Sequence, residues 1–377
     1  MRAISRHASA LYSLVVGAAV FVWVTGGAII DPTRRDWLML GDSAQHYLGW
    51  AFFRDTPLVQ WPIGANPKLG LEFASSIVFT DSIPLLAFVF KPFNALLPET
   101  FQYLGLWIWA CFVLQAWFAV RVLSHFFTDR TQQFLGATLC VVAPVLSYRL
   151  VHQGYGHIAL ASHFLVLAAL HAYFSPRART WWWAVLVSSA LLVQADFVPM
   201  VLGVWLASLV SKRKGLARTA REAAVVGGSL GVVAVVSGFA SLGGRLFVGD
   251  SSVTPQDFPY RFRWQPMALV DPSTDFSRGW SRVLADQLEL FGDVEGFTYL
   301  GSGILLVLVP VAAVVLAHKR GVVSWKGIVG ALSVTAVLAV VSGFASLGGR
   351  LFVGDSSVTP QDFPYRFRWQ PMALVDP

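Results

Sequence analysis

Long apolar segments recur along this chain, and they constrain its fold more than any other feature. A membrane-spanning helix needs about 20 predominantly apolar residues, and runs of that kind begin at Ala10–Ile30 and continue through most of the sequence. The mean hydropathy is +0.60. Only 13% of the residues are charged, against about a quarter in soluble domains. The sequence therefore predicts an all-α integral membrane protein.

The apolar runs predict about nine transmembrane helices. They are Ala10–Ile30, Ile77–Leu97, Phe101–Leu123, Phe134–Tyr148, Ile158–Phe174, Trp181–Val210, Ala223–Leu242, Tyr299–Ala317 and Val322–Ser342. The run Trp181–Val210 is either one tilted helix or two halves broken near Gln194, Asp196 and Pro199. The distribution of basic residues favours one helix, because a single crossing there keeps the N-terminus and Lys212 on one side.

Basic clusters between the apolar runs predict the orientation. Cytoplasmic loops carry an excess of lysine and arginine, and such clusters occur at Lys212–Arg221 and His318–Lys326. The N-terminus is then cytoplasmic, with Ala10–Ile30 as an uncleaved anchor. The loops Asp31–Ser76 and Gly243–Thr298 lie outside, so we expect a multi-pass membrane protein with a large first outer loop.

The same distribution of charge limits the partners. The formal net charge is +7, but the basic residues do not form a basic face with interleaved aromatics of the kind that binds nucleic acid. Membrane lipids are the expected partners. Cys111 and Cys140 each lie inside an apolar run, which predicts neither a disulfide framework nor a metal cluster.

An internal repeat complicates the second half of the chain. Ala339–Pro377 repeats Ala234–Pro272 letter for letter. Its boundary falls inside an apolar run rather than in a linker, which favours a recent duplication or an assembly error over a functional tandem module. On this interpretation the natural protein continues beyond the second copy.

The predicted organisation has four parts. Residues 1–242 form a transmembrane module that includes the outer loop 31–76. Residues 243–298 form a second outer loop, in which Arg278–Phe291 has the spacing of an amphipathic interfacial helix. Residues 299–342 add further transmembrane helices. Residues 339–377 are the repeated copy.

The first outer loop and its exit hold the candidate catalytic residues. Asp42 could act as a general base towards an acceptor hydroxyl, or it is a solvated loop residue or a helix cap. His46 lies four residues on and would share a helical face with Asp42. Asp81, at the start of an apolar run, would face a polar cavity and could bind a divalent cation with Asp42. Alternatively, Asp81 caps a helix that begins late, near Ser82 and Pro84.

Basic and polar residues in the two outer loops suggest a phosphate site. Arg54 and Lys68 in the first loop, and Tyr260, Arg261 and Arg263 in the second, could hold an anionic lipid phosphate; snorkelling at the headgroup boundary is the alternative. Asp196 either lines a cavity or marks a helix break. His152, His157, His163 and His171 lack the spacing of a helical zinc site, and the predicted topology puts His157 near the cytoplasmic side. The metal requirement is left open.

Five stretches carry a resemblance to a known family. They are GDSAQHYLGWAFFRDTPLVQWPIGANPKLG, FTDSIPLLAFVFKPF, PETFQYLGLWIWACFVLQ, APVLSYRLVHQGYGHIALASHFLVLAALHAY and YRFRWQPMALVDP. They resemble the uncharacterised bacterial membrane proteins grouped as domain of unknown function 6311. That family in turn resembles the GT-C glycosyltransferases, multi-span enzymes that use polyprenyl-phosphate-linked sugars at the outer face.

The resemblance implies a function and roles for individual residues. The resemblance gives Asp42 the position of the catalytic acidic residue and Asp81 the second acidic position, although the DxD motif usual in sugar transferases is absent from the first loop. The expected activity is transfer of a sugar from a polyprenyl-phosphate-linked donor to a cell-surface glycan, lipid or protein. The alternatives are a non-catalytic carrier or flippase for lipid-linked saccharides, and an inactive rearranged chain. The sugar, the acceptor and the oligomeric state are not specified.

Overall fold

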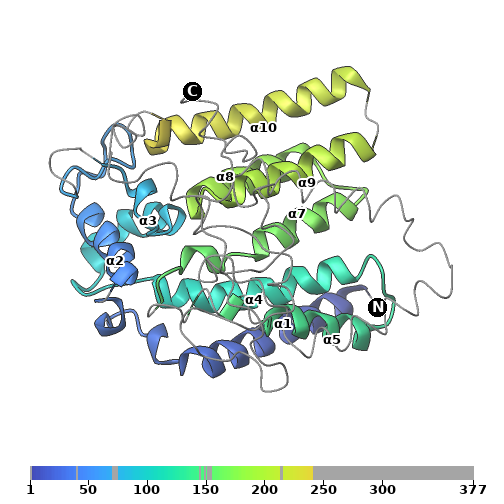
Figure 1. The fold of residues 1–377 in the computed structure, drawn as a ribbon, viewed down its shortest axis with the longest axis horizontal. Coiled ribbons are helices and arrows are strands. Elements are labelled where there is room, and N and C mark those ends of the chain that lie inside the picture. The colour runs from blue at the N-terminus through green and yellow to red at the C-terminus, as the bar shows by residue number, and fades with distance from the viewer. Residues whose placement is uncertain are drawn as a thin grey trace, which may run out of the picture. The chain divides into compact units, whose positions relative to one another are not determined.

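A computed structural model describes residues 2–39, 41–69, 75–143, 146–147, 150, 155–212 and 215–240. These residues fold into helices joined by turns and loops, and no strand occurs among them. The all-α prediction is therefore confirmed for this part of the chain. Figure 1 shows most of the helices lying side by side along one direction, with shorter ones gathered at one end of the bundle.

Three helices of the described part are long and apolar enough to cross a membrane: α1 (Arg2–Thr25), α4 (Leu104–Leu123) and α10 (Leu216–Ser237). This finding is compatible with a membrane protein. The count of about nine spans stays a prediction, and its last two members lie outside the described residues. The repeat, apart from its first residues in α10, also lies outside them.

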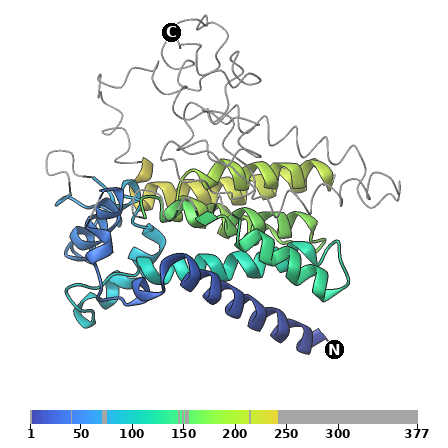
Figure 2. The same cartoon turned by 60° about the horizontal axis from the view of Figure 1, so that its bottom comes forward.

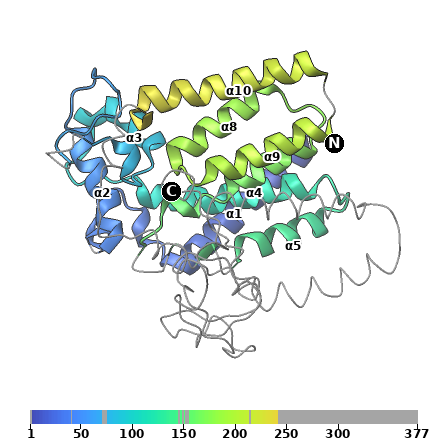
Figure 3. The same cartoon turned by 45° about the horizontal axis from the view of Figure 1, so that its top comes forward.

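Shorter helices run alongside these three. They are α5 (Arg130–Val141), α7 (Phe164–Phe174), α8 (Thr180–Val193) and α9 (Phe197–Ser211). Helix α4 packs against α1, α5 and α7, while α8 packs against α9 and α10 (Figure 3). Small residues permit this close approach, as in other membrane helix pairs. At Gly17, a β-carbon would collide with the backbone of Val113 on α4.

Two further helices stand at one end of the bundle. These are α2 (Gly41–Arg54) and α3 (Pro84–Phe90), with the 3₁₀ turns η1 (Ala28–Ile30), η2 (Asp36–Leu38), η3 (Ile77–Phe79) and η4 (Lys91–Leu96) near them in sequence. The short turn η5 (Ala159–Ala161) precedes α7. The N-terminus of α1 lies at the opposite end (Figure 2). We call the end that holds α2 and α3 the α2 end, and it carries the candidate site.

The predicted span Ile77–Leu97 is not one helix. It divides into η3, α3 and η4, because Asp81 and Ile83 take left-handed backbone conformations with φ of 51°. Pro84 then begins α3, the first helical position that proline favours. The late helix start was one of the two interpretations of this segment, but Ile83 rather than Asp81 occupies the N-cap position.

The predicted single span Trp181–Val210 is also wrong, since it divides into α8 and α9. The break falls at Gln194–Asp196, where Gln194 is extended with φ of −162°. One predicted crossing is lost at Ile77–Leu97, and one is gained at Trp181–Val210. Whether the number of crossings between the N-terminus and Lys212 is odd or even therefore does not change. The N-terminus and Lys212 therefore still lie at the same end of the bundle (Figure 1).

Candidate functional site

A strained turn at the α2 end is the core of the candidate site. Asp81 and Ile83 both have φ of 51°, and Tyr155 has φ of 71°. Within the described ranges, no other residue besides glycine has a positive φ. A branched residue such as Ile83 rarely adopts this conformation, and each such residue costs about 1–3 kcal/mol. Strain of this kind persists where surrounding contacts hold it, and it concentrates at functional sites.

Buried hydrogen bonds hold the turn in place. The Ser82 hydroxyl donates to the backbone oxygen of His46 over 2.6 Å, and the Tyr103 hydroxyl donates to the Ser82 carbonyl. Helix α2 also packs closely on the turn at Gly49, where a β-carbon would collide with the side chains of Thr80 and Ser82. The sequence thus fixes the turn from both α2 and the start of α4.

His46 ties the turn to a second strained segment. Its Nδ1 lies 2.7 Å from the Asp81 carbonyl oxygen, and its Nε2 lies 2.8 Å from the Gly156 carbonyl oxygen. Both ring nitrogens thus lie within hydrogen-bonding distance of a main-chain oxygen. His46 is 2% exposed and cross-links two backbone segments.

The Asp81 side chain faces a group of polar residues from three other segments. Burial raises the pKa of the Asp81 carboxyl group, and the like charge of Asp196 raises it further. The charges of His46 and His157 and a hydrogen bond from Gln194 oppose this rise in pKa without cancelling it. Asp81 therefore holds its proton to a higher pH than an ordinary aspartate, and a perturbed carboxyl group of this kind is a candidate functional residue.

The break between α8 and α9 supplies Gln194 and Asp196. The Gln194 amide donates to the Asp196 carboxylate over 3.0 Å, and it also hydrogen-bonds Asp81. One amide group thus bridges two carboxyl groups. The sequence predicted a helix break or a cavity lining at this polar pair, but it did not predict the contact with Asp81. The signal was the occurrence of two polar residues within a long apolar run.

His157 lies at the α2 end, so the prediction that it is at the other end from Asp42 is wrong. Its charge acts on Asp81, and its neighbour Gly156 accepts a bond from His46. The prediction failed because it counted Ile77–Leu97 as a crossing. Next to His157, the Tyr155 ring meets Trp37 of η2 edge to face, with ring centroids 5.1 Å apart. This brings aromatic surface to the same site.

Asp42 is exposed in the first turn of α2, where the helix dipole stabilises an acidic side chain. It precedes His46 by about one helical turn, as the spacing predicts. Its assignment as general base stays a prediction.

The predicted phosphate-binding residues differ in their surroundings. The Arg54 guanidinium hydrogen-bonds the Asn94 side chain and the carbonyls of Leu97, Pro98 and Glu99, and it lies over the Trp50 ring. Arg54 therefore holds the η4–α4 connection. Lys68 is exposed. Tyr260, Arg261 and Arg263 lie outside the described residues, as does the helix predicted at Arg278–Phe291.

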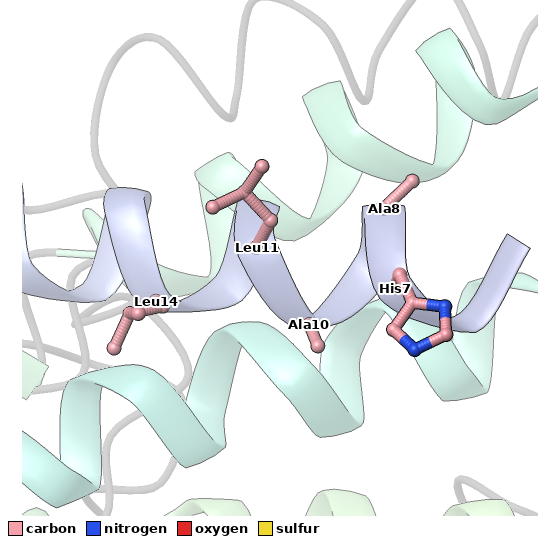
Figure 4. Close-up of a pocket in the computed structure, with 5 residues that line it drawn as sticks. All are labelled: His7, Ala8, Ala10, Leu11 and Leu14. Carbon is pink, nitrogen blue, oxygen red and sulfur yellow. The ribbon is translucent and has the colours of Figure 1, made fainter. Parts of the chain in front are cut away.

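Two other features of the described residues offer less chemistry. A hollow on α1 is lined by His7, Ala8, Ala10, Leu11 and Leu14, and it contains no carboxylate (Figure 4). His125 and His171 lie 3.0 Å apart, Nε2 to Nδ1, where α4 and α7 end. Among the residues that the structure describes, no group of three or more His, Cys, Asp or Glu is placed to hold a metal ion.

Comparison with known proteins places the chain in a family. No curated protein and no solved structure matches it. One family model does match, over residues 14–367, and this range contains α2, the strained turn and the α8–α9 break. The chain belongs to the family described as domain of unknown function (DUF6311).

Proposed function

We propose that this chain is a membrane glycosyltransferase of the GT-C type in a bacterial inner membrane. It transfers a sugar from a polyprenyl-phosphate-linked donor to a cell-surface glycan, lipid or protein at the periplasmic face. The observation that carries the proposal is the half-buried Asp81 carboxyl group, held in a strained turn beside Asp196 and close to α2. Glycosyl transfer needs a carboxylate base for the incoming hydroxyl, and a second carboxyl group can hold the hydroxyl groups of the sugar.

The position of the site supports a lipid-linked donor. The α2 end is also where α1 and α10 end (Figure 1), and both helices are long enough to span a bilayer. A sugar on a membrane-embedded polyprenyl phosphate lies at this level, next to the headgroups. The opposite end carries Arg177, Arg179 and Lys212, which favours a cytoplasmic location for that end.

We assign separate roles to the two acidic groups. Asp42 is exposed and takes the proton from the acceptor hydroxyl. Asp81 orients the hydroxyl groups of the sugar, and His46 fixes the backbone on either side of it. The leaving phosphate needs positive charge where negative charge develops, and Lys68 is the exposed member of the predicted phosphate-binding set within the described residues.

The test is sugar transfer by the purified full chain in lipid nanodiscs. The donor is a radiolabelled polyprenyl-phosphate sugar, and an envelope fraction supplies the acceptors. We expect Asp42→Asn to lower the rate by about 10²–10⁴, the usual contribution of a general base, and Asp81→Asn to lower it as well. Asparagine tolerates the left-handed backbone at position 81, so the fold should survive.

Asp55→Asn is the matched control, because Asp55 is exposed immediately after α2 and should not affect transfer. Normal transfer by both the Asp42 and the Asp81 variant would refute the proposed site. Movement of the intact donor across the bilayer without product would instead indicate the carrier.

A further inference from the structure

In the loop between α2 and η3, large apolar side chains are exposed to solvent, and a polar side chain turns inward. Leu58, Val59 and Trp61 are 61%, 91% and 67% exposed. Loops in water normally show polar side chains, and an exposed apolar patch marks a contact with a partner or a membrane. We call residues 57–63 the apolar tip.

A polar side chain supports the tip from within. The Gln60 amide donates to the carbonyls of Ala65 and Ile63 over 2.7 and 3.1 Å, and to the Thr56 hydroxyl over 3.2 Å. Gln60 therefore turns inward and satisfies the backbone of the loop, while its apolar neighbours turn outward. This arrangement fixes the shape of the tip before it meets any partner.

The base of the loop is bound to the last turn of α10. The backbone N–H of Ile63 donates to the Val236 carbonyl over 2.9 Å, and the Ser76 hydroxyl donates to the Ser237 carbonyl over 2.9 Å. Gly64 packs so closely that a β-carbon would collide with the Ser237 carbonyl oxygen. The loop and the end of α10 thus stand at the same depth.

The length of α10 gives that depth. Its 22 residues extend about 33 Å at 1.5 Å per residue, close to the hydrocarbon thickness of about 30 Å. The end of α10 therefore lies at the boundary between hydrocarbon and headgroups. Residues hydrogen-bonded to this end stand at the boundary too.

We propose that the apolar tip inserts into the lipid headgroup region beside α10 and anchors the first outer loop to the membrane surface. The composition fits this partner, because residues 56–67 contain no charged side chain and tryptophan favours the interface. Lys68 follows directly and is exposed, so its ammonium group can meet lipid phosphates. This inference does not depend on the proposed enzymatic activity.

The experiment measures the lipid exposure of position 59 in the full chain. Val59→Cys is made in a Cys140→Ser background, labelled with an environment-sensitive fluorophore and reconstituted into vesicles of phosphatidylethanolamine and phosphatidylglycerol. Thr33→Cys is the matched control, because Thr33 is exposed in a charged loop shortly after α1 at the same end of the bundle. Lipids with a nitroxide in the headgroup or high on the acyl chain act as quenchers.

We expect a blue-shifted emission and strong nitroxide quenching at position 59, with little of either at position 33. Equal, weak quenching at both positions would overturn the proposal and leave the tip as a surface for water or for a protein partner. Adding Gln60→Ala to the Val59→Cys variant should reduce the quenching, because the tip loses its internal support. Unchanged quenching in that variant would refute the role given to Gln60.

Discussion

At the scale of single residues, His46 and Asp81 have distinct tasks. Both ring nitrogens of His46 lie against backbone carbonyl oxygens, so this side chain positions backbone. Asp81 keeps its carboxyl group for contacts with Gln194 and, through charge, with Asp196 and His157. At the strained turn, His46 therefore holds the main chain, and Asp81 presents its side chain to the polar group.

The titration of Asp81 tests this environment without any assay of activity. Its pKa should lie above the ordinary value of about 3.9, since burial and the charge of Asp196 both disfavour the carboxylate. Asp196→Asn removes the like charge and should lower the Asp81 pKa. The carboxyl stretching band of ¹³C-aspartate-labelled protein follows the titration, and its loss in Asp81→Asn identifies the band. A midpoint unaffected by Asp196→Asn would contradict the coupling.

The residues of the site could be predicted from the sequence only in part. Asp81 was identified because ionisable groups within apolar runs are costly, and Asp196 was noted inside a predicted span. His46 was identified from its spacing to Asp42. Their meeting was not predictable. It depends on the carbonyl groups of residues 81 and 156, and a backbone carbonyl has no signature in the sequence. The strain at Ile83 was equally hidden, because isoleucine is among the least expected residues at positive φ.

At the scale of elements, the contact between α2 and the strained turn depends on Gly49. Only a residue without a β-carbon fits between α2 and the side chains of Thr80 and Ser82. The neighbouring Asn66 amide donates to the Gly49 carbonyl over 3.0 Å, which locks the same point from the loop. Helix α2 is therefore positioned by one close backbone approach as well as by His46.

Replacing Gly49 should separate α2 from the turn. We expect Gly49→Ala to destabilise the folded state by about 1–3 kcal/mol, the usual cost of overpacking, as measured by denaturant unfolding in detergent. Gly228→Ala is the control, because its β-carbon meets nothing within 4 Å and alanine favours a helix interior by about 0.5–1 kcal/mol. If both variants were equally stable, the close packing at Gly49 would be disproved.

The two incorrectly predicted elements have one physical cause. Hydropathy averaged over a long window outweighs a few polar or strained residues. Asp81, Ser82 and Pro84 interrupt the run Ile77–Leu97, and Gln194 and Asp196 interrupt Trp181–Val210. In both cases, the interruption is where the chain turns and where the site forms. Helix α4, by contrast, closely matches the predicted span Phe101–Leu123.

At the scale of the whole molecule, one group of basic residues lies at the end of the bundle opposite the candidate site. Arg177, Arg179 and Lys212 follow α7 and α9, while the strained turn and α2 stand where α1 and α10 end (Figures 1 and 2). Charge thus predicted the relative placement of these ends even though two individual spans were wrong. It did so because the two errors changed the number of crossings in opposite directions.

Cysteine accessibility in intact cells tests the orientation proposed for these ends. A membrane-impermeant thiol reagent added from outside should label Thr33→Cys but not Arg177→Cys, after removal of the outer membrane barrier. Both residues are exposed, so burial does not explain a difference. Lysed cells should show labelling at both positions. The reverse pattern in intact cells would invert the orientation and place the site in the cytoplasm.

The way His46 holds its neighbours has a consequence for how this scaffold can change. Every bond from its ring goes to a main-chain oxygen, which residues 81 and 156 present whatever their side chains. The side chain at position 81 can therefore be exchanged without loss of the bonds that hold the turn, provided that the new residue tolerates the left-handed backbone. A substitution at position 81 can thus change the side chain that the turn presents while both bonds from His46 stay in place.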